Sequence, residues 1–220
     1  MSTDDFVKQV FLLTTGKLPT FTEGSPNYER IVAIGNFYLR QFAFEYGVDW
    51  NFFYDPEFSI GTASNETSYS LDDDIYKLSS QEGDSVIIRN GDLERDYTIV
   101  SSNRLREYKN KNAVAKVGRN LRFSRPIDET LQGGDITAPV YLTPEPFKRA
   151  KQEIEPPEIT NWLVFATAAD RVKNDATRKD LRADLAAQAN ELLESLKEIN
   201  NGQVSEMHRG WSPTQHIGEW

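Results

Sequence analysis

Three consecutive aspartates, Asp72-Asp73-Asp74, form the longest uninterrupted acidic run in the sequence. Clustered carboxylates can hold Mg²⁺ or Ca²⁺, but successive residues of an extended segment point to opposite faces. The calcium-loop pattern, which has acids at alternate positions, a central glycine and a closing glutamate, is absent. We therefore expect a solvated turn that leads into Ile75 and Tyr76, and not a metal site.

The other motifs that could carry chemistry also lack residues that they need. His208 and His216, the only histidines, lie eight positions apart in a C-terminal segment that offers no third metal ligand. Thr15-Gly16-Lys17 resembles the end of a phosphate-binding loop, but Phe11 stands where that loop needs its first glycine. The sequences Gly-x-Ser-x-Gly, His-Glu-x-x-His and Gly-x-Gly-x-x-Gly do not occur. We nominate no catalytic, cofactor-binding or metal-binding residue, and we predict that the chain is not an enzyme.

The composition excludes further classes of protein. The 220 residues include no cysteine, which removes thiol catalysis, disulfide scaffolds and cysteine-bearing zinc sites. The chain has 25 lysines and arginines against 34 aspartates and glutamates, a net charge of −9, whereas a free-standing nucleic-acid binder usually has a basic excess. The longest stretch without a charge, Ile159 to Ala169, is far shorter than the about 20 residues of a membrane span. We expect no membrane partner.

The N-terminal part of the sequence predicts two helices. Ser2 or Thr3 can cap the first helix, the acidic residues that follow suit its first turn, and Gly16 is a stop signal. Ser25-Pro26 begins a second helix of about six turns that ends near Gly47. Its dense aromatic residues indicate either a stripe packed in a core or a partly exposed stripe at a subunit interface.

The middle of the sequence favours short strands separated by turns. The segment Ser85–Val100 predicts a hairpin around Asn90-Gly91, a pair that suits a type I′ turn. Residues 114–123 predict a second, shorter hairpin. Residues 136–142 are typical of a final strand, in which Pro139 indicates an edge or a bulge. We interpret this region as an antiparallel β module inserted between helices.

Helices return in the C-terminal third of the sequence. Pro156-Pro157 starts one helix, and Asn174-Asp175 is a turn or cap signal before the next. A short loop between two amphipathic helices predicts an antiparallel pair. The second helix has a narrow apolar seam over about 24 residues, made of Leu181, Leu185, Ala189, Leu192, Leu196 and Ile199.

The last segment, Asn200 to Trp220, loses this periodicity and holds both histidines and two of the four tryptophans. An exposed tryptophan gains nothing in a disordered tail, and tryptophan is a preferred hot-spot residue of interfaces. An extended tail with two aromatic anchors therefore predicts docking onto another chain, and the alternative is that the tail folds back on its own domain. The candidate partner-binding residues are His208, Trp211, His216 and Trp220.

Together these elements predict an α+β fold. We expect an antiparallel α-helical bundle with an inserted antiparallel β-rich module and an extended C-terminal tail. The predicted boundaries are residues 1–56 for the N-terminal helices, 57–143 for the β-rich module, 144–200 for the helical pair that completes the bundle, and 201–220 for the tail.

Five segments of the chain share features with one known family. They are Trp50-Asn51-Phe52-Phe53 at the exit of the second helix, Ser68–Leu78 at the opening of the β module, Leu121–Pro126 and Pro139-Val140-Tyr141 at its closing strands, and Pro157–Asp175 at the start of the C-terminal helices. Through these segments, over roughly residues 5–200, the chain resembles the head-to-tail adaptor proteins of tailed phages, also called head-completion or tail-tubular connector proteins. One position departs from that family's pattern, because Asp72 stands where such proteins commonly have proline.

The resemblance implies a structural protein of the virion, located in the neck and made in the host cytoplasm. It implies a ring of identical subunits, usually twelve, that contacts the portal protein and a downstream tail or neck protein. Double-stranded DNA would pass through the lumen without specific binding, and no cofactor is implied. The alternatives are a tail-completion or terminator protein, a β-type carbohydrate-binding module, and a metal-dependent hydrolase that uses Asp72-Asp73-Asp74.

Overall fold

The computed structural model describes residues 1–44, 48–79, 81 and 83–210, of which residues 203–210 are described by their backbone only. By the contacts within it, the chain divides into two compact units. We call residues 1–52 and 144–220 the helical unit, and residues 53–143 the β unit.

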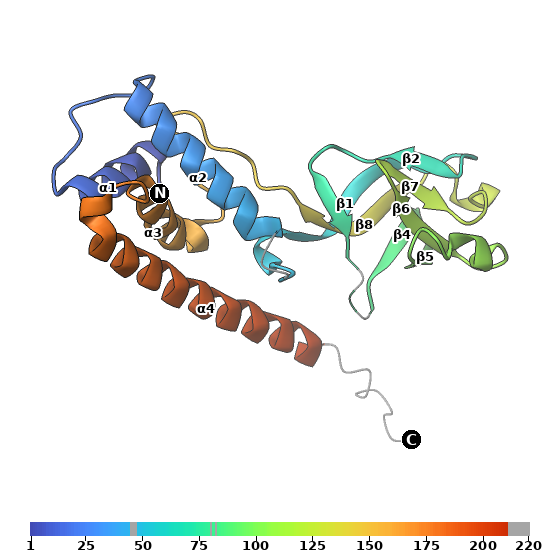
Figure 1. Ribbon diagram of the computed structural model, residues 1–220. Coiled ribbons are helices and arrows are strands. Elements are labelled where there is room, and N and C mark those ends of the chain that lie inside the picture. The colour runs from blue at the N-terminus through green and yellow to red at the C-terminus, as the bar shows by residue number, and fades with distance from the viewer. Residues whose placement is uncertain (45–47, 80, 82, 211–220) are drawn as a thin grey trace, which may run out of the picture. The chain divides into compact units, whose positions relative to one another are not determined.

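The fold class predicted from the sequence is wrong. In the described residues the dominant element is an eight-stranded sheet that curls into a half-barrel, accompanied by four α-helices (Figure 1). Most of the helical residues lie after the sheet in the chain. The protein therefore has a mixed α/β structure and is not a helical bundle with a β insertion. The sheet was underestimated because its pairings join distant residues, such as Tyr54 and Tyr141.

The first two helices begin where the sequence predicts. The helix α1 is Thr3–Thr15, where the Ser2 side chain accepts a hydrogen bond from the backbone N–H of Asp5. The glycine that follows it, Gly16, has a left-handed conformation with φ 70°, so both caps of this helix are confirmed. The helix α2 is Pro26–Phe44, and its predicted end near Gly47 lies outside the described residues.

The last two helices differ from the prediction in their limits. The helix α3 is Thr160–Arg171 and α4 is Lys179–Gly210. Residues 201–210, which were predicted to begin an extended tail, therefore continue α4. The stripe of α4 that the helical unit covers consists of Leu185, Ala189, Leu193, Leu196 and Asn200.

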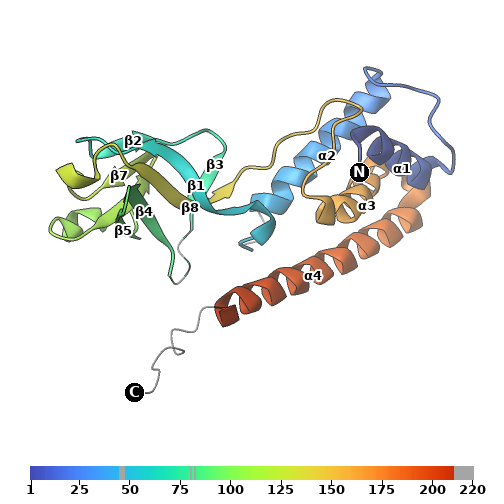
Figure 2. The ribbon, with the colours of Figure 1, turned by 180° about the vertical axis from the view of Figure 1, so that it is seen from behind.

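The sheet has the strand order β1-β8-β4-β5-β6-β7-β2, and β3 pairs with β8 (Figures 1 and 2). All its pairs are antiparallel except β5 with β6, so the prediction of an antiparallel module is wrong for that pair. The strands are β1 Tyr54–Thr62, β2 Ser68–Ser70, β3 Ile75–Leu78, β4 Ser85–Asn90, β5 Leu93–Ile99, β6 Ala113–Val117, β7 Asn120–Phe123 and β8 Asp135–Leu142. The short 3₁₀ helices are η1 Asn51–Phe53, η2 Leu105–Tyr108, η3 Glu129–Leu131, η4 Pro157–Ile159 and η5 Ala176–Arg178.

Both predicted hairpins are confirmed, with one change in the turn. The strands β4 and β5 pair from Ser85 with Thr98 to Asn90 with Leu93, so the central residues of the turn are Gly91 and Asp92. A type I′ turn needs positive φ at both central residues. Gly91 has φ 59°, but no described residue other than glycine has a positive φ, so the type I′ prediction is wrong.

The bulge predicted at Pro139 is confirmed. The strand β8 is a central strand, because β1 lies on one side and β4 and β3 lie on the other. Opposite Pro139 the register of β1 shifts between Asp55 and Phe58. Proline has no N–H to donate to a ladder, and this irregularity in β1 accommodates it.

A continuous apolar core fills the concave side of the sheet. Val86 and Ile88 of β4, Tyr97 of β5 and Leu121 and Phe123 of β7 are all buried there. The Phe123 ring packs edge-on against Tyr97, with ring centroids 4.9 Å apart. Since alternate residues of a strand face opposite sides, the core side of each strand determines which residues face outward.

Aromatic residues build the core of the helical unit. Trp50 is 1% exposed and stacks on Phe42, with ring centroids 4.2 Å apart, and Phe42 also contacts Trp162. The chain passes close to α2 at Gly35, where a Cβ atom would lie 2.7 Å from Cζ of Phe147 and 2.8 Å from Cζ of Phe6. For Tyr28 and Phe42, burial favours the core interpretation over the interface interpretation, whereas Phe37 on the same helix is 59% exposed.

A hydroxyl group in this core should be dispensable. The Tyr28 hydroxyl is buried and has no hydrogen-bond partner in the described part of the chain. Burial, and then the charges of Asp4, Glu23 and Glu29, raise the pKa of Tyr28 to about 12. A buried polar group without a partner costs free energy. We therefore expect Tyr28→Phe to raise the free energy of unfolding by about 1 kcal/mol in urea denaturation.

The matched control is Tyr38→Phe. The Tyr38 hydroxyl donates a hydrogen bond of 3.2 Å to Oδ2 of Asp170, so the same chemical change should lower stability at this position. Equal losses in both variants would contradict the interpretation of Tyr28.

Candidate interaction surfaces

The acidic run Asp72-Asp73-Asp74 forms an exposed turn before β3, as predicted. Oδ1 of Asp73 lies 2.6 Å from Nη1 of Arg119, and the carbonyl oxygen of Asp74 accepts a hydrogen bond from the N–H of Thr143. Both members of the ion pair are more than 70% exposed, so the pair contributes little to stability. Among the described residues, no three His, Cys, Asp or Glu side chains are grouped so that they could hold a metal ion.

The phosphate-loop-like residues Thr15-Gly16-Lys17 lie at the C-terminal end of α1. Arg178 donates a hydrogen bond to the carbonyl oxygen of Thr14, and Arg171 donates one to its hydroxyl oxygen. Phosphate loops place anions at a helix N-terminus, where N–H groups are free. Here Arg178 satisfies a backbone carbonyl at the opposite end of a helix and Arg171 bonds to a side-chain hydroxyl beside it, so both have a structural role.

The convex face of the sheet is acidic across β1, β8, β4 and β5. On β4 and β5, Val86, Ile88 and Tyr97 face the core, so Arg89, Glu94 and Asp96 face outward. The register places Arg89 opposite both Glu94 and Asp135. We define the acidic face as Glu57 of β1, Glu94 and Asp96 of β5, and Asp135 of β8, with Arg89 among them.

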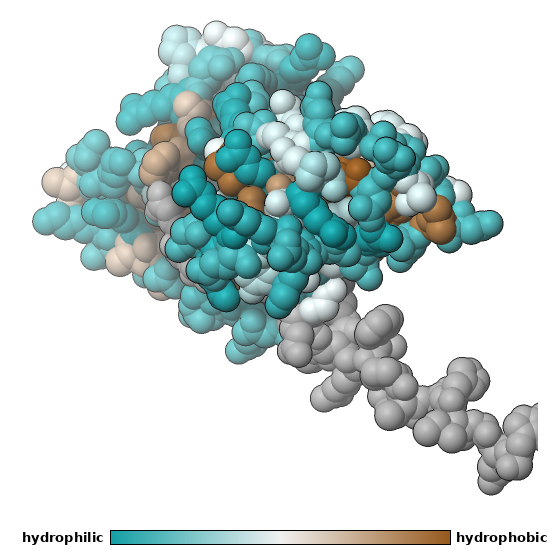
Figure 3. Space-filling model, turned by 90° about the vertical axis from the view of Figure 1, so that its right-hand side faces the viewer, coloured by the Kyte–Doolittle hydropathy of each residue, from teal (hydrophilic) through white to brown (hydrophobic). Residues whose placement is uncertain are grey.

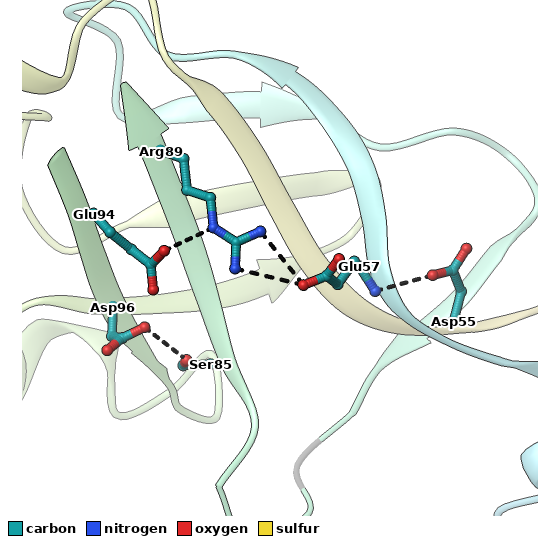
Figure 4. Close-up of polar contacts among 6 residues, drawn as sticks. All are labelled: Asp55, Glu57, Ser85, Arg89, Glu94 and Asp96. Carbon is teal, nitrogen blue, oxygen red and sulfur yellow. Dashed lines mark hydrogen bonds and ion pairs between the residues drawn. The ribbon is translucent and has the colours of Figure 1, made fainter. Parts of the chain in front are cut away.

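Arg89 is the cation at the centre of this face (Figure 4). Its Nε lies 2.7 Å from Oε2 of Glu94, and its Nη1 lies 3.4 Å from Oε1 of Glu57. The hydrogen bond to Glu94, followed by the charge of Glu94, raises the pKa of Arg89. Asp96 accepts a hydrogen bond from the Ser85 hydroxyl. One guanidinium therefore serves two carboxylates, Glu57 and Glu94, and the face keeps an excess of negative charge.

A basic segment follows directly in the chain. Residues 101–125 contain eight basic residues and one acidic residue, Glu107, a net charge of +7. The rest of the β unit, residues 53–100 and 126–143, contains three basic and 14 acidic residues, a net charge of −11. The basic residues are Arg104, Arg106, Lys109, Lys111, Lys116, Arg119, Arg122 and Arg125.

The basic segment is held over β6 by a small apolar cluster. Leu105 of η2 packs on Ala113 and Ala115, and Tyr108 lies against the same cluster. The Tyr108 ring is flanked by two cations, with Cζ of Arg104 at 5.8 Å and Nζ of Lys111 at 5.6 Å from its centroid. The charges of η2 therefore project from a fixed surface.

Lys116 differs from the other cations of the segment. It pairs with Leu121, which is buried, so its side chain points to the core side of the sheet. Its Nζ donates hydrogen bonds to the carbonyl oxygens of Ile75 and Tyr76 on β3. Burial lowers the pKa of Lys116. Lys116 links two strands across the sheet and does not belong to the outer surface.

The helical unit has an apolar groove between α1, α3 and α4. Its volume is about 450 Å³, and Leu12 on its wall is 43% exposed. The lining residues are Gln9, Leu12, Leu13, Asn161, Val164, Phe165 and Leu192. Leu192 and Ile199 were predicted to lie in the covered seam of α4, but Leu192 is half-buried in this groove and Ile199 is 49% exposed. Their positions, seven residues apart, place a second apolar stripe on α4.

Asn200 is a polar residue in the covered stripe of α4, and it is 2% exposed. Its Oδ1 accepts a hydrogen bond of 2.7 Å from the N–H of Asn51, and its Nδ2 donates one of 3.1 Å to the carbonyl oxygen of Asp49. Asn200 thereby ties α4 to the segment that follows α2. Sequence reasoning did not identify this residue. Its place next to the predicted seam position Ile199 could have indicated a polar side chain that is buried and hydrogen-bonded.

The predicted partner-binding residues are only partly described. The backbone of His208 is helical, within α4, and its side chain is not among the described ones. Trp211, His216 and Trp220 lie outside the described residues.

Comparison with protein-family models and with curated proteins gives no match. Among the described helices, none is both long enough and apolar enough to cross a bilayer. The side of the molecule in Figure 3 is mostly hydrophilic, with hydrophobic residues gathered in a few small patches. The function is therefore inferred from the surfaces above and from the resemblance in sequence.

Proposed function

We propose that this chain is a virion structural protein of a tailed phage, a head-to-tail adaptor. In this proposal its copies form a closed ring in the neck, between the portal protein and a tail or neck protein. Double-stranded DNA passes through the ring without specific binding. The support is of two kinds: the five segments that resemble that family, and surfaces suited to contacts between chains.

The observation that carries the proposal is the helix α4. At 1.5 Å per residue its 32 residues extend for about 48 Å. Its covered stripe is narrow, and Leu192 and Ile199 form a second apolar stripe beside it. In a closed ring each copy must present two different faces to its two neighbours. The helix α4 packs on its own unit through the covered stripe and keeps the second apolar stripe for contact with another copy, so it suits this requirement.

The groove between α1, α3 and α4 adds a second suitable surface. Leu12, Leu13 and Leu192 line it with Val164 and the half-buried Phe165. Apolar pockets of this kind accept anchor side chains at interfaces between chains. The groove and the second stripe of α4 share Leu192, so the two form one continuous contact surface.

The carbohydrate-binding alternative gains no support from the β unit. Such modules stack sugars on exposed aromatic side chains. Here Tyr97, Phe123 and Tyr141 are each at most 3% exposed, so they belong to the interior. Among the described residues of the β unit, Tyr76 on β3 is the exposed aromatic, at 44%, and one ring is not the cluster on one face that this alternative needs.

The proposal is tested with the portal protein encoded by the same genome. The purified full-length chain is mixed with portal rings, and the product is imaged by electron microscopy. We expect rings of this chain seated on the portal. A chain that stays monomeric and leaves the portal bare would contradict the proposal.

The contribution of the C-terminal tryptophans is measured in the same assay. We expect Trp211→Ala with Trp220→Ala to weaken portal binding by about 30-fold or more, because a buried tryptophan contributes about 2 kcal/mol or more at a hot spot. The control is Thr214→Ala with Gln215→Ala, which changes the same segment and keeps both tryptophans. If the tryptophan variant binds the portal with unchanged affinity, this segment does not dock onto the portal. The electron microscopy images would then still test separately whether the chain forms a ring.

A further inference from the structure

We propose that the acidic face of the β unit in one copy binds the basic segment of the β unit in the next copy. The proposal rests on the ring of the proposed function and names the surface through which neighbouring copies recognise each other. It concerns Glu57, Glu94, Asp96 and Asp135 on one side. On the other side are Arg104, Arg106, Lys109, Lys111 and Arg122.

The first argument is that most of these charges are not compensated within the chain, although Arg104 pairs with Glu107, and Glu57 and Glu94 share Arg89. In the described part of the chain, Arg106, Lys109, Lys111 and Arg122 make no ion pair. On the acidic face, Arg89 is the cation that the carboxylates share. A net charge of −11 and a net charge of +7 thus lie side by side in one small unit, and each attracts the other kind of surface.

The second argument is the direction in which the two surfaces face. The acidic face covers β1, β8, β4 and β5, and the basic segment covers β6 and β7, which follow them in the strand order. The sheet curls so that its edge strands β1 and β2 contact each other (Figure 1). The convex sides of β8 and of β7 therefore point in different directions. One copy cannot press its own surfaces together, whereas a head-to-tail neighbour can meet both.

The third argument concerns the choice between a protein partner and DNA. Basic side chains around Tyr108 also suit nucleic acid, since phosphates and bases attract such groups. The same unit, however, carries its acidic excess on the adjoining strands, which repels a polyanion. A second copy of the chain offers a basic segment to the acidic face and an acidic face to the basic segment. DNA is complementary to the basic segment only.

The pairs are exposed, so their main effect is on recognition and association rate. Exposed ion pairs contribute little stability each and are weakened by salt. Complementary charges across an interface steer association and select the orientation of the partner. We therefore expect assembly through this surface to weaken as the salt concentration rises.

The experiment uses two charge-reversal variants of the full chain. Variant A carries Glu94→Lys and Asp96→Lys on the acidic face, and variant B carries Arg106→Glu and Lys109→Glu on the basic segment. All four positions are exposed, and melting curves verify that both variants fold. Self-association is measured by sedimentation velocity, alone and on portal rings. The control for variant A is Glu66→Lys with Glu129→Lys, two exposed residues of the same unit that are not part of the acidic face.

We expect variants A and B each to self-associate at least tenfold more weakly than the wild type. An equimolar mixture of A and B should recover assembly, because the reversed face of A matches the reversed segment of B and the remaining surfaces match as in the wild type. The control should assemble like the wild type. Growth of the mixture beyond a dimer supports the head-to-tail arrangement.

Three results would overturn the pairing. In the first, A and B assemble like the wild type on the portal, and the adaptor function then stands without this surface. In the second, the mixture does not recover. In the third, B loses affinity for a 30-base-pair DNA duplex while its self-association is unchanged, which identifies the basic segment as a DNA-binding surface. Conversely, recovery in the mixture together with no binding to portal rings keeps the pairing and rejects the adaptor function.

Discussion

Replacement of Trp50 by alanine should lower the free energy of unfolding by about 3–5 kcal/mol, the range found for large aromatic side chains in cores. Trp50 is 1% exposed, and its ring stacks on Phe42. Its Nε1 donates a hydrogen bond of 2.8 Å to the carbonyl oxygen of Phe42. The substitution therefore removes apolar burial, an aromatic contact and the partner of a buried carbonyl group together.

Urea denaturation monitored by circular dichroism measures this loss. The control Phe37→Ala removes an aromatic side chain that is 59% exposed on α2, and we expect a loss below about 1 kcal/mol. The conservative variant Trp50→Phe keeps an aromatic ring and loses the donor, so its loss should be intermediate. A loss for Trp50→Ala as small as that for Phe37→Ala would show that the residues after α2 are not anchored by this ring.

Replacement of Asn200 by alanine should lower the free energy of unfolding by about 2–4 kcal/mol, because it leaves two backbone groups without partners. These are the N–H of Asn51 and the carbonyl oxygen of Asp49, both of which bond to the Asn200 side chain. The effect should be local as well as global. Amide hydrogen exchange should rise first in the part of α4 that follows residue 196, since this turn loses its tie to the segment after α2.

The neighbouring residue provides a matched control. Asn201→Ala is the same substitution, one position further along the same helix, at an exposed side chain. We expect Asn201→Ala to change stability by less than about 0.5 kcal/mol. Similar losses and similar exchange rates in the two variants would contradict the role of Asn200. If α4 mediates ring contacts, Asn200→Ala should also weaken ring assembly more than Asn201→Ala does.

Several local features could be predicted from the sequence because neighbouring residues determine them. Ser2 and Gly16 define the ends of α1 through hydrogen bonds within one turn of the helix. The hairpin of β4 and β5 follows from a glycine with positive φ between two alternating runs. The position of the turn was displaced by one residue, since the ladder pairs Asn90 with Leu93, and cross-strand packing decides such a shift.

The candidate surfaces were harder to predict. The sequence shows how many charges the chain carries, but not that Glu57, Glu94 and Asp135 share one face. That placement depends on the register between strands far apart in the chain, as does the contact of Arg89 with Glu57. The four candidate docking residues were selected for their residue types and for their place in a C-terminal segment without periodicity, and the structure describes only the backbone of His208 among them.

The sequence by itself determined the starts of α1 and α2, the hairpins, the buried aromatic residues of α2 and the exposed aspartate turn, because these depend on side-chain types within a few residues. Only the tertiary structure decided that the sheet dominates the fold. The strand β1 contains Pro56 and Gly61, which disfavour a strand locally, and it forms because β8 supplies its partners across the chain. The role of Asn200 and the positions of the two charged surfaces likewise depend on contacts between residues that are far apart in the sequence. No local sequence pattern reports the free energy of such contacts.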